Sequence, residues 1–181
     1  MSTEMTTDRL RLRHVGLSDV ALFVPLIGDF EVAKNLTVVP HPYRDEDGSL
    51  WVEEMARRAE DGKGHNFAVT KHQDGTFIGI CSVNMVHGLL DLGYWLGRPF
   101  WGRGYATEAA GRVTAFAFDT LGVLAVTSGF YADNPASGHV LGKLGFRFTG
   151  TATVHCRSRN SEVVCNRVLL TREEYEREKV S

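Results

Sequence analysis

A glycine-containing turn in the middle of the chain joins a predicted strand to a predicted helix, and this arrangement limits the possible folds. Residues 101–109 read Trp-Gly-Arg-Gly-Tyr-Ala-Thr-Glu-Ala, with a strand pattern over 91–96 before them and a helical pattern over 107–121. The amides that open a helix lack intrahelical partners and carry the positive end of its dipole, so they attract anions. Gly102 and Gly104 allow close approach of a phosphate to the backbone. The turn therefore predicts a site for a ligand that carries a diphosphate.

Hydrophobic periodicity predicts seven strands and four helices in one α/β unit. Hairpin turns join the second, third and fourth strands, which predicts an antiparallel meander. A helical crossover separates the fourth strand from the fifth and predicts parallel pairing between them. The predicted strands cover residues 10–13, 66–71, 76–84, 91–96, 123–130, 146–149 and 163–170, and the helices begin near Ser18, Asp47 or Ser49, Thr107 and Asn134.

Length and charge narrow the class of protein. The 181 residues predict one domain, with a core over about residues 7–171 and no linker. The formal net charge of −2 gives no basic face for nucleic acid, and no apolar run approaches the roughly 20 residues of a membrane span. The three scattered cysteines and the lack of an apolar leader predict a cytoplasmic protein. Neither these cysteines nor the seven histidines have metal-site spacing, so we expect no metal.

Two common phosphate-binding motifs do not fit the glycine turn. Thr107 stands where the dinucleotide motif has its third glycine, and no Gly-Lys-Ser/Thr follows as in a P-loop. A tight turn without a ligand is the alternative from these residues alone. A second group of residues downstream favours a site. Asn134-Pro135-Ala136-Ser137 opens a helix, and Lys143-Leu144-Gly145-Phe146 closes it.

Three stretches strongly resemble the GCN5-related N-acetyltransferase (GNAT) superfamily. They are 7–13, the segment from Leu92 through Ala109, and 134–146, in the right order and at the right separations. The first two are similar to the ribosomal-protein N-terminal acetyltransferase branch, the RimJ/RimL-like proteins. The resemblance covers nearly the whole chain. It implies a mixed, largely antiparallel central sheet of about seven strands, splayed between the fourth and fifth, with helices on both faces.

The same resemblance implies that acetyl-CoA is the co-substrate. In this chain the backbone groups that pair with pantetheine and face the thioester would belong to Tyr94, Trp95 and Leu96. Asn134 would contact coenzyme A. Trp101 is a departure, because it stands where the family pattern has Gln or Arg. The amides that hold the pyrophosphate would be those of Trp101, Gly102, Arg103, Gly104, Tyr105, Ala106 and Thr107.

The residue that assists the leaving thiolate departs from the superfamily. Many members carry a tyrosine seven residues after the helix-start asparagine, but this chain has Leu141 there, which excludes a tyrosine acid at that position. Ser137 is the residue that the RimJ/RimL-like branch offers instead, because its hydroxyl is able to hydrogen-bond the departing sulfur. The alternative for Ser137 is to satisfy the amides at the start of the helix.

The general base is less clear from the sequence. Asp91 and His87 come just before or at the start of the central strand, and either is a candidate to take the amine proton directly or through water. A solvated strand end and a turn are their alternatives. Glu108 fits better as an acidic residue that complements the helix dipole, and Cys81 fits better as a core residue than as a nucleophile.

The sequence therefore predicts an N-acetyltransferase that moves an acetyl group from acetyl-CoA to a primary amine by direct attack in a ternary complex. The acceptor is a protein N-terminus or a small amine. A non-catalytic acyl-CoA-binding or sensing module is the alternative. We expect acceptor specificity from residues 28–48, including His41 and Tyr43, and from the turn at 156–161 with Arg157 and Arg159. The resemblance also makes a homodimer plausible.

Overall fold

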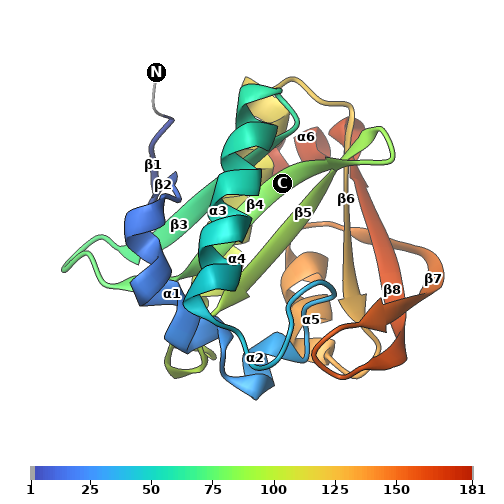
Figure 1. Cartoon of the computed structure of the whole chain (residues 1–181). Coiled ribbons are helices and arrows are strands. Elements are labelled where there is room, and N and C mark those ends of the chain that lie inside the picture. Colours follow the sequence, from blue (N-terminus) through green and yellow to red (C-terminus); the bar gives the residue numbers. More distant parts are fainter. Residues whose placement is uncertain (1–2, 181) are drawn as a thin grey trace.

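The computed structural model describes residues 3–180, apart from the side chains of 178 and 180, and contains one mixed sheet with helices on both faces (Figure 1). The sheet has eight strands in the order β1-β2-β3-β4-β5-β6-β8-β7. The fold class is as predicted, and the extra strand is the two-residue β1, which is too short for a periodicity pattern. The strands are β1 Met5–Thr6, β2 Leu10–His14, β3 Gly64–Lys71, β4 Phe77–Val86, β5 Leu89–Leu96, β6 Ala125–Tyr131, β7 Arg147–Cys156 and β8 Ser161–Thr171.

The sheet opens between β5 and β6. Their parallel pairing extends only from Leu90 opposite Val126 to Leu92 opposite Ser128, and the two strands separate beyond that point. All other neighbouring strands in the sheet pair antiparallel. The predicted splay between the fourth and fifth strands is therefore present, and it carries the labels β5 and β6 because β1 adds one to the count.

The helices cover both faces of this sheet. In Figure 1, α1 and α3 lie in front of the sheet and α4 lies behind it. Three short helical turns, η1 Leu17–Asp19, η2 Arg98–Phe100 and the π-helical η3 Phe116–Thr120, adjoin these helices. The α-helices are α1 Val20–Ile27, α2 Phe30–Ala33, α3 Asp45–Glu60, α4 Tyr105–Ala115, α5 Pro135–Lys143 and α6 Arg172–Val180.

Three predicted helix starts were wrong. Helix α4 begins at Tyr105 rather than Thr107, with Gly104 at its N-cap. Ser18 lies inside η1, and the following helix α1 has Asp19 at its N-cap. Helix α3 begins at Asp45, before both predicted caps, because the Asp47 carboxylate accepts a hydrogen bond of 2.9 Å from the backbone amide of Arg44. Asp47 therefore stabilises the first turn of the helix from inside it.

Alternation along β5 divides the molecule into two halves. Leu92, Tyr94 and Leu96 pack with the cluster that includes α4, and Trp95 packs with the cluster that includes α1 and α3. Because successive strand residues point to opposite faces, Asp91 and Gly93 share the face of Trp95. The central strand thus presents one set of side chains to each side of the sheet, and both sets reach the opening beside β6.

Candidate active site

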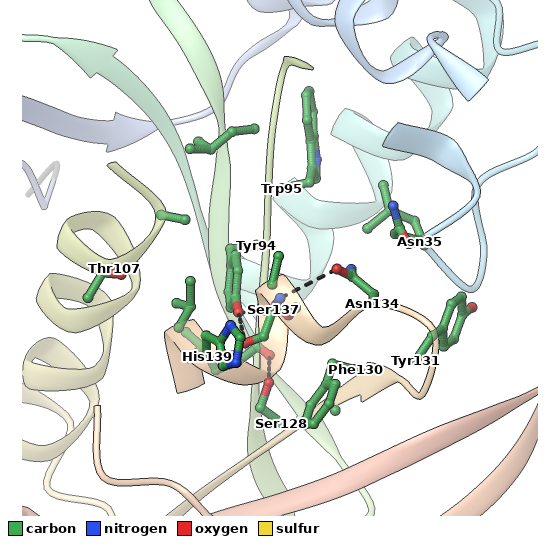
Figure 2. Close-up of a pocket in the computed structure, with 18 of the residues that line it drawn as sticks. Asn35, Tyr94, Trp95, Thr107, Ser128, Phe130, Tyr131, Asn134, Ser137 and His139 are labelled. Carbon is green, nitrogen blue, oxygen red and sulfur yellow. Dashed lines mark hydrogen bonds between the residues drawn. The ribbon is translucent and has the colours of Figure 1, made fainter. Parts of the chain in front are cut away.

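A cavity of about 600 Å³ lies where β5 and β6 separate, and we call it the gap cavity. Its walls come from β5, the glycine turn, the start of α4, β6 and α5. Figure 2 shows Tyr94, Ser137 and Asn134 among the side chains that line it. The predicted site residues that line the gap cavity are Asp91, Tyr94, Trp95, Leu96, Trp101, Gly102, Gly104, Tyr105, Ala106, Thr107, Asn134 and Ser137.

Two predicted site residues lie outside this lining. His87 occupies the turn between β4 and β5 with φ 48°, and neither of the two cavities described here includes it. Arg103 belongs to the glycine turn, but only its neighbours Gly102 and Gly104 line the gap cavity. Its carbonyl oxygen accepts a hydrogen bond of 2.9 Å from Arg9. Twelve of the fourteen predicted site residues therefore line the gap cavity, and His87 and Arg103 do not.

The glycine turn delivers free backbone amides to the cavity. Gly102 and Gly104 have φ of 71° and 78°, a left-handed conformation that side chains with a Cβ rarely adopt. The first intrahelical bond of α4 runs from the Glu108 amide to the Gly104 carbonyl at 3.1 Å. The amides of Tyr105 and Ala106 therefore have no partner inside the helix, and they sit at the positive end of its dipole.

Trp101 fastens the glycine turn to the end of the central strand. Its indole Nε1 donates a hydrogen bond of 2.8 Å to the carbonyl oxygen of Leu96. This contact explains how the chain tolerates a tryptophan where the family pattern has Gln or Arg. The side chain shapes the loop. The Trp101 amide, which was predicted to bind the pyrophosphate, instead donates to the Arg98 carbonyl oxygen at 3.2 Å, so the amides that remain available for an anion begin at Gly102.

A second set of contacts that holds the glycine turn comes from the turn between β1 and β2. Arg9 Nε donates to Glu108 Oε2 at 2.7 Å, and the Thr7 hydroxyl and the Arg9 amide both donate to Glu108 Oε1. The Arg9 guanidinium also lies over the Tyr105 ring, 4.6 Å from its centroid. Burial alone would raise the pKa of Glu108, but these hydrogen bonds prevail and lower it. Glu108 therefore acts as an ionised structural tie, in line with the non-catalytic interpretation of its sequence position.

A pair of hydroxyl groups lies between β5 and α5. Tyr94 Oη is 2.8 Å from Ser137 Oγ, either atom being able to donate, and it also lies 3.1 Å from the Ser137 carbonyl oxygen (Figure 2). Asn134 caps α5 by accepting a bond from the Ser137 amide at 3.4 Å. Burial raises the pKa of Tyr94 to about 12, so the phenol keeps its proton near neutral pH. Both contacts of the Tyr94 hydroxyl are with Ser137, so the proton that the pair is able to offer to a ligand is that of the Ser137 hydroxyl.

Asp91 lies at the mouth of the gap with two donors on the same oxygen. Arg167 Nη2 and Thr127 Oγ1 each donate to Asp91 Oδ1 at 2.9 Å. Among residues 3–180, no hydrogen bond reaches the other carboxylate oxygen, Oδ2. The Asp91 side chain keeps 25% of its surface exposed. The carboxylate is therefore held in place by one oxygen and open at the other.

A second cavity, of about 570 Å³, lies on the α1 and α3 side of β5, and we call it the aromatic cavity. Phe23, Tyr43, Trp51 and Trp95 line it together with Leu50. The two cavities share the lining residues Leu36, Thr37, Asp91, Gly93, Tyr94 and Trp95. They are therefore contiguous along the central strand, with Asp91 at their junction.

The predicted specificity segments contribute unequally to the aromatic cavity. Tyr43 and Arg157 line it, whereas His41 packs on Phe30 with ring centroids 5.1 Å apart, outside the lining. Arg159 forms an ion pair with Asp133 and also lies outside it. A hydrogen bond joins the segment 28–48 to the turn at 156–161. The Arg157 amide donates to the carbonyl oxygen of Thr37 at 3.1 Å.

Sequence reasoning missed three contributors to the site. The Tyr94 hydroxyl, Arg167 and Arg9 reach their partners across 43, 76 and 99 residues of chain, respectively. Strand alternation is the signal that placed Tyr94 on the opposite face from Asp91, but it does not identify Ser137 as its partner. Cys81 is fully buried in the core, where burial raises the pKa of its thiol, as expected for a packing residue.

Within the described residues, no helix is long and apolar enough to cross a membrane.

The chain is similar to solved acetyltransferase structures, which share its fold. RimJ from Mycobacterium smegmatis, solved in complex with CoA-disulfide, has a TM-score of 0.81 at 19% identity, over 96% of this chain and 88% of that one. Ribosomal-protein-S5-alanine acetyltransferase from Vibrio fischeri has a TM-score of 0.76 at 16% identity, over 91% and 95% of the two chains.

Sequence comparison gives the same family. The uncharacterized N-acetyltransferase p20 of Bacillus licheniformis is 26% identical over 147 residues, which are 80% of this chain and 82% of p20. The family model described as the acetyltransferase (GNAT) domain matches residues 9–147, from Arg9 through the glycine turn and α5 to the start of β7. This chain therefore belongs to the GNAT acetyltransferase family.

Proposed function

We propose that this protein transfers an acetyl group from acetyl-CoA to a primary amine by direct attack in a ternary complex. One observation carries the proposal: the gap cavity runs from the free amides of α4 to Asp91, where the aromatic cavity begins. A thioester in one cavity and an amine in the other would meet at this junction. The coenzyme complex of the RimJ structure supports the choice of donor.

The backbone is well suited to hold coenzyme A. In this proposal the amides of the glycine turn, including that of Arg103, and of the first turn of α4 bind the pyrophosphate. The edge of β5 beyond Leu92, which lacks a partner strand on the β6 side, pairs with pantetheine. Asn134 and Ser137 form the opposite wall from α5. These groups suit an elongated, anionic ligand because they combine a positive helix end with an apolar channel.

The reaction needs a positioned nucleophile and a stabilised leaving group. The amine nitrogen attacks the thioester carbonyl carbon, and the C–S bond breaks as the amide C–N bond forms. Ser137 Oγ–H donates a hydrogen bond to the departing sulfur, while Tyr94 Oη–H donates to Ser137 Oγ over their 2.8 Å contact. Two aligned hydroxyls strengthen one another in a low-dielectric site, so the pair is a better donor than serine alone.

We assign the amine to Asp91. A carboxylate is a far weaker base than an alkylamine in water, so Asp91 does not simply deprotonate a free ammonium. An amine that arrives as an ammonium loses its extra proton to solvent water before it attacks. The open Oδ2 of Asp91 holds the amine at the junction and accepts the next proton once the new C–N bond has made that nitrogen acidic. His87 has no part in this mechanism because it lies outside both cavities.

Calorimetry and thiol release test the proposal together. Acetyl-CoA should bind the folded protein, and addition of an accepted primary amine should release one free thiol for each amide formed. A folded protein that shows no heat with millimolar acetyl-CoA would contradict the proposed donor. Tight coenzyme binding without thiol release across a broad amine panel would instead favour a non-catalytic acyl-CoA-binding module.

A further inference from the structure

We infer that the acceptor is a small primary amine carried on a planar aromatic or other apolar body, bound in the aromatic cavity with its nitrogen at Asp91. The inference rests on the proposed acetyl transfer and adds the class of substrate. It is carried by three features of the aromatic cavity: its walls, its charges and the segment that closes it.

The walls form one connected set of aromatic rings. Phe23 lies at the centre, with ring centroids 5.9 Å from Trp51, 6.5 Å from Tyr43 and 6.4 Å from Phe77. Phe77 itself is buried and does not line the cavity, but it lies 6.5 Å from Trp95 and so connects the rings of the wall. Rings at such separations attract a further ring that enters edge-on or offset, beyond the gain from burying its area. The walls therefore favour a flat apolar guest over a hydrated one.

The floor of the cavity leaves room for this guest beside the central strand. Gly93 lies between Asp91 and Trp95 on the same face and has no side chain, and its cross-strand partner is the small Ser82. A Cβ added to Gly93 would stand 3.4 Å from Ser82 Oγ. The missing side chain therefore creates a hollow that runs from the aromatic walls to the carboxylate.

The charged groups around the cavity leave one open acceptor beside the gap cavity. Asp47 and Asp91 line it as carboxylates, and Arg157 is the cationic side chain in the lining. Asp47 already accepts a bond from the Arg44 amide, and Asp91 Oδ1 is occupied by Arg167 and Thr127. Asp91 Oδ2 is thus the open acceptor next to the gap cavity. This arrangement suits a monoamine better than a polycation, which needs several open carboxylates.

A chain segment closes the cavity on the β8 side. Residues 33–38 are tied to the β7–β8 turn through the Ser158 hydroxyl to Ala33, Arg159 to Lys34, and Arg157 to Thr37 and Val38. Figure 1 shows the segment after α2 beside this turn. Tyr131 Oη adds a bond of 3.1 Å to the Thr37 hydroxyl. The tied segment therefore gives this side of the cavity a fixed wall, which favours a compact molecule over the terminus of a folded protein.

An acceptor competition tests the class of substrate. At saturating acetyl-CoA, thiol release should give 2-phenylethylamine a kcat/KM at least tenfold above those of spermidine and of a tripeptide with an N-terminal alanine. An enclosed apolar contact of one ring is worth more than this factor. A preference for spermidine or for the peptide would overturn the inference and leave the proposed acetyl transfer intact.

Variants at the cavity rim separate substrate recognition from folding. Leu50 lines the aromatic cavity and is 66% exposed, so its replacement leaves the core unchanged. Leu50→Lys should lower kcat/KM for 2-phenylethylamine by about tenfold through charge repulsion, while the neutral Leu50→Gln should change it by about twofold at most. Both should bind acetyl-CoA like the parent. Equal kinetics for the two variants would contradict an ammonium in this cavity.

A half-buried wall position gives the complementary test. Trp51→Leu retains an apolar side chain but removes the ring. The KM for 2-phenylethylamine should therefore rise several-fold more than the KM for butylamine, which has no ring. Calorimetric affinity for acetyl-CoA should not change. Absence of transfer to every amine by the parent protein, with acetyl-CoA bound, would count against the proposed function itself. Unchanged discrimination between the two amines would count only against the aromatic site.

Discussion

The gap cavity and the aromatic cavity share the central strand but are built from different parts of the chain. Main-chain amides and an unpaired strand edge dominate the gap cavity, and glycines with positive φ make them accessible. Side chains from α1, α3, the segment after α2, β4 and β5 make the walls of the aromatic cavity. Trp101 illustrates the difference, because an altered side chain in the glycine turn leaves the amides in place.

This contrast explains why the donor is easier to recognise than the acceptor. A site made of backbone depends on a few residues with special conformations, and these leave a local sequence pattern. A site made of side chains depends on many residues from separate elements, each of which is free to vary. The following predictions test whether the two halves are as separable as this comparison suggests.

The largest effect is expected at the Tyr94–Ser137 hydroxyl pair of the gap cavity. Ser137→Ala should lower kcat by roughly 100-fold and leave acetyl-CoA affinity within about threefold, because a transition-state donor is lost. Tyr94→Phe should lower kcat by about tenfold, since the serine remains but its partner hydroxyl is gone. Single-turnover kinetics and calorimetry measure the two quantities. Tyr175→Phe removes a hydroxyl that pairs with Asp119 on the surface, and it serves as the control.

A glycine replacement should affect the gap cavity alone. Gly104 has φ of 78°, and a Cβ there would stand 3.3 Å from the Arg9 guanidinium. Gly104→Val should weaken acetyl-CoA binding by about tenfold to 100-fold, because left-handed backbone strain costs about 1–3 kcal/mol. Gly142→Ala on α5, where a Cβ meets nothing within 4 Å, is the matched control. Normal coenzyme affinity in the Gly104→Val protein would refute the backbone model of the gap cavity.

Loss of the hydrogen bonds between Arg9 and the glycine turn should have a smaller effect on acetyl-CoA binding. Arg9→Ala should weaken acetyl-CoA binding by about threefold, because Arg9 holds the Arg103 carbonyl and Glu108 from a partly exposed position. Arg11→Ala removes a neighbouring exposed arginine that pairs only with Glu4, so it controls for the loss of charge. Isothermal titration of both variants measures the difference. Equal affinities would mean that the turn keeps its shape without the tie.

The smallest effect concerns stability outside both cavities. His14 and His65 face each other at 6.1 Å, and burial lowers the pKa of each, with the neighbouring His14 lowering that of His65 further. The unfolded chain therefore binds more protons below its ordinary histidine pKa of about 6.5, so stability present above that value falls as the pH drops through it. Urea unfolding at pH about 7.5 and about 5 should show a smaller drop for His65→Gln than for the exposed His72→Gln.

Local patterns predicted most of the fold and the donor half of the site. The glycine turn, the Asn134 helix start and the four-strand succession before them are short-range features, and all lie where periodicity and capping indicate. The ends of α4 were less predictable. Residues 116–120 continue it as a π-helix, so the apolar pattern extends beyond the α-helical part. The separation of β5 from β6 was available only through family resemblance.

The remaining site contacts depend on register between distant strands and helices. Periodicity predicts that Tyr94 and Asp91 lie on opposite faces of β5, but not that Ser137 and Arg167 stand next to them. The aromatic cavity depends in addition on the absence of a side chain at Gly93, which a sequence alone does not distinguish from a strand irregularity. His87 was a reasonable candidate by proximity along the chain, yet a hairpin turn carries it away from the gap.

The tie formed by Arg9 has a consequence for how coenzyme and chain terminus influence one another. The Arg9 amide donates to Glu108 Oε1 at 3.0 Å, and the Arg9 guanidinium donates to the Arg103 carbonyl oxygen in the turn that we propose to bind the pyrophosphate. Coupling free energies between two sites are reciprocal. If the contacts of Arg9 stabilise the coenzyme-bound form of the glycine turn, then bound coenzyme must stabilise the Arg9 contacts by the same free energy. Bound coenzyme would then slow amide hydrogen exchange at residue 9, and any tag that strains this segment would appear as a weaker affinity for acetyl-CoA.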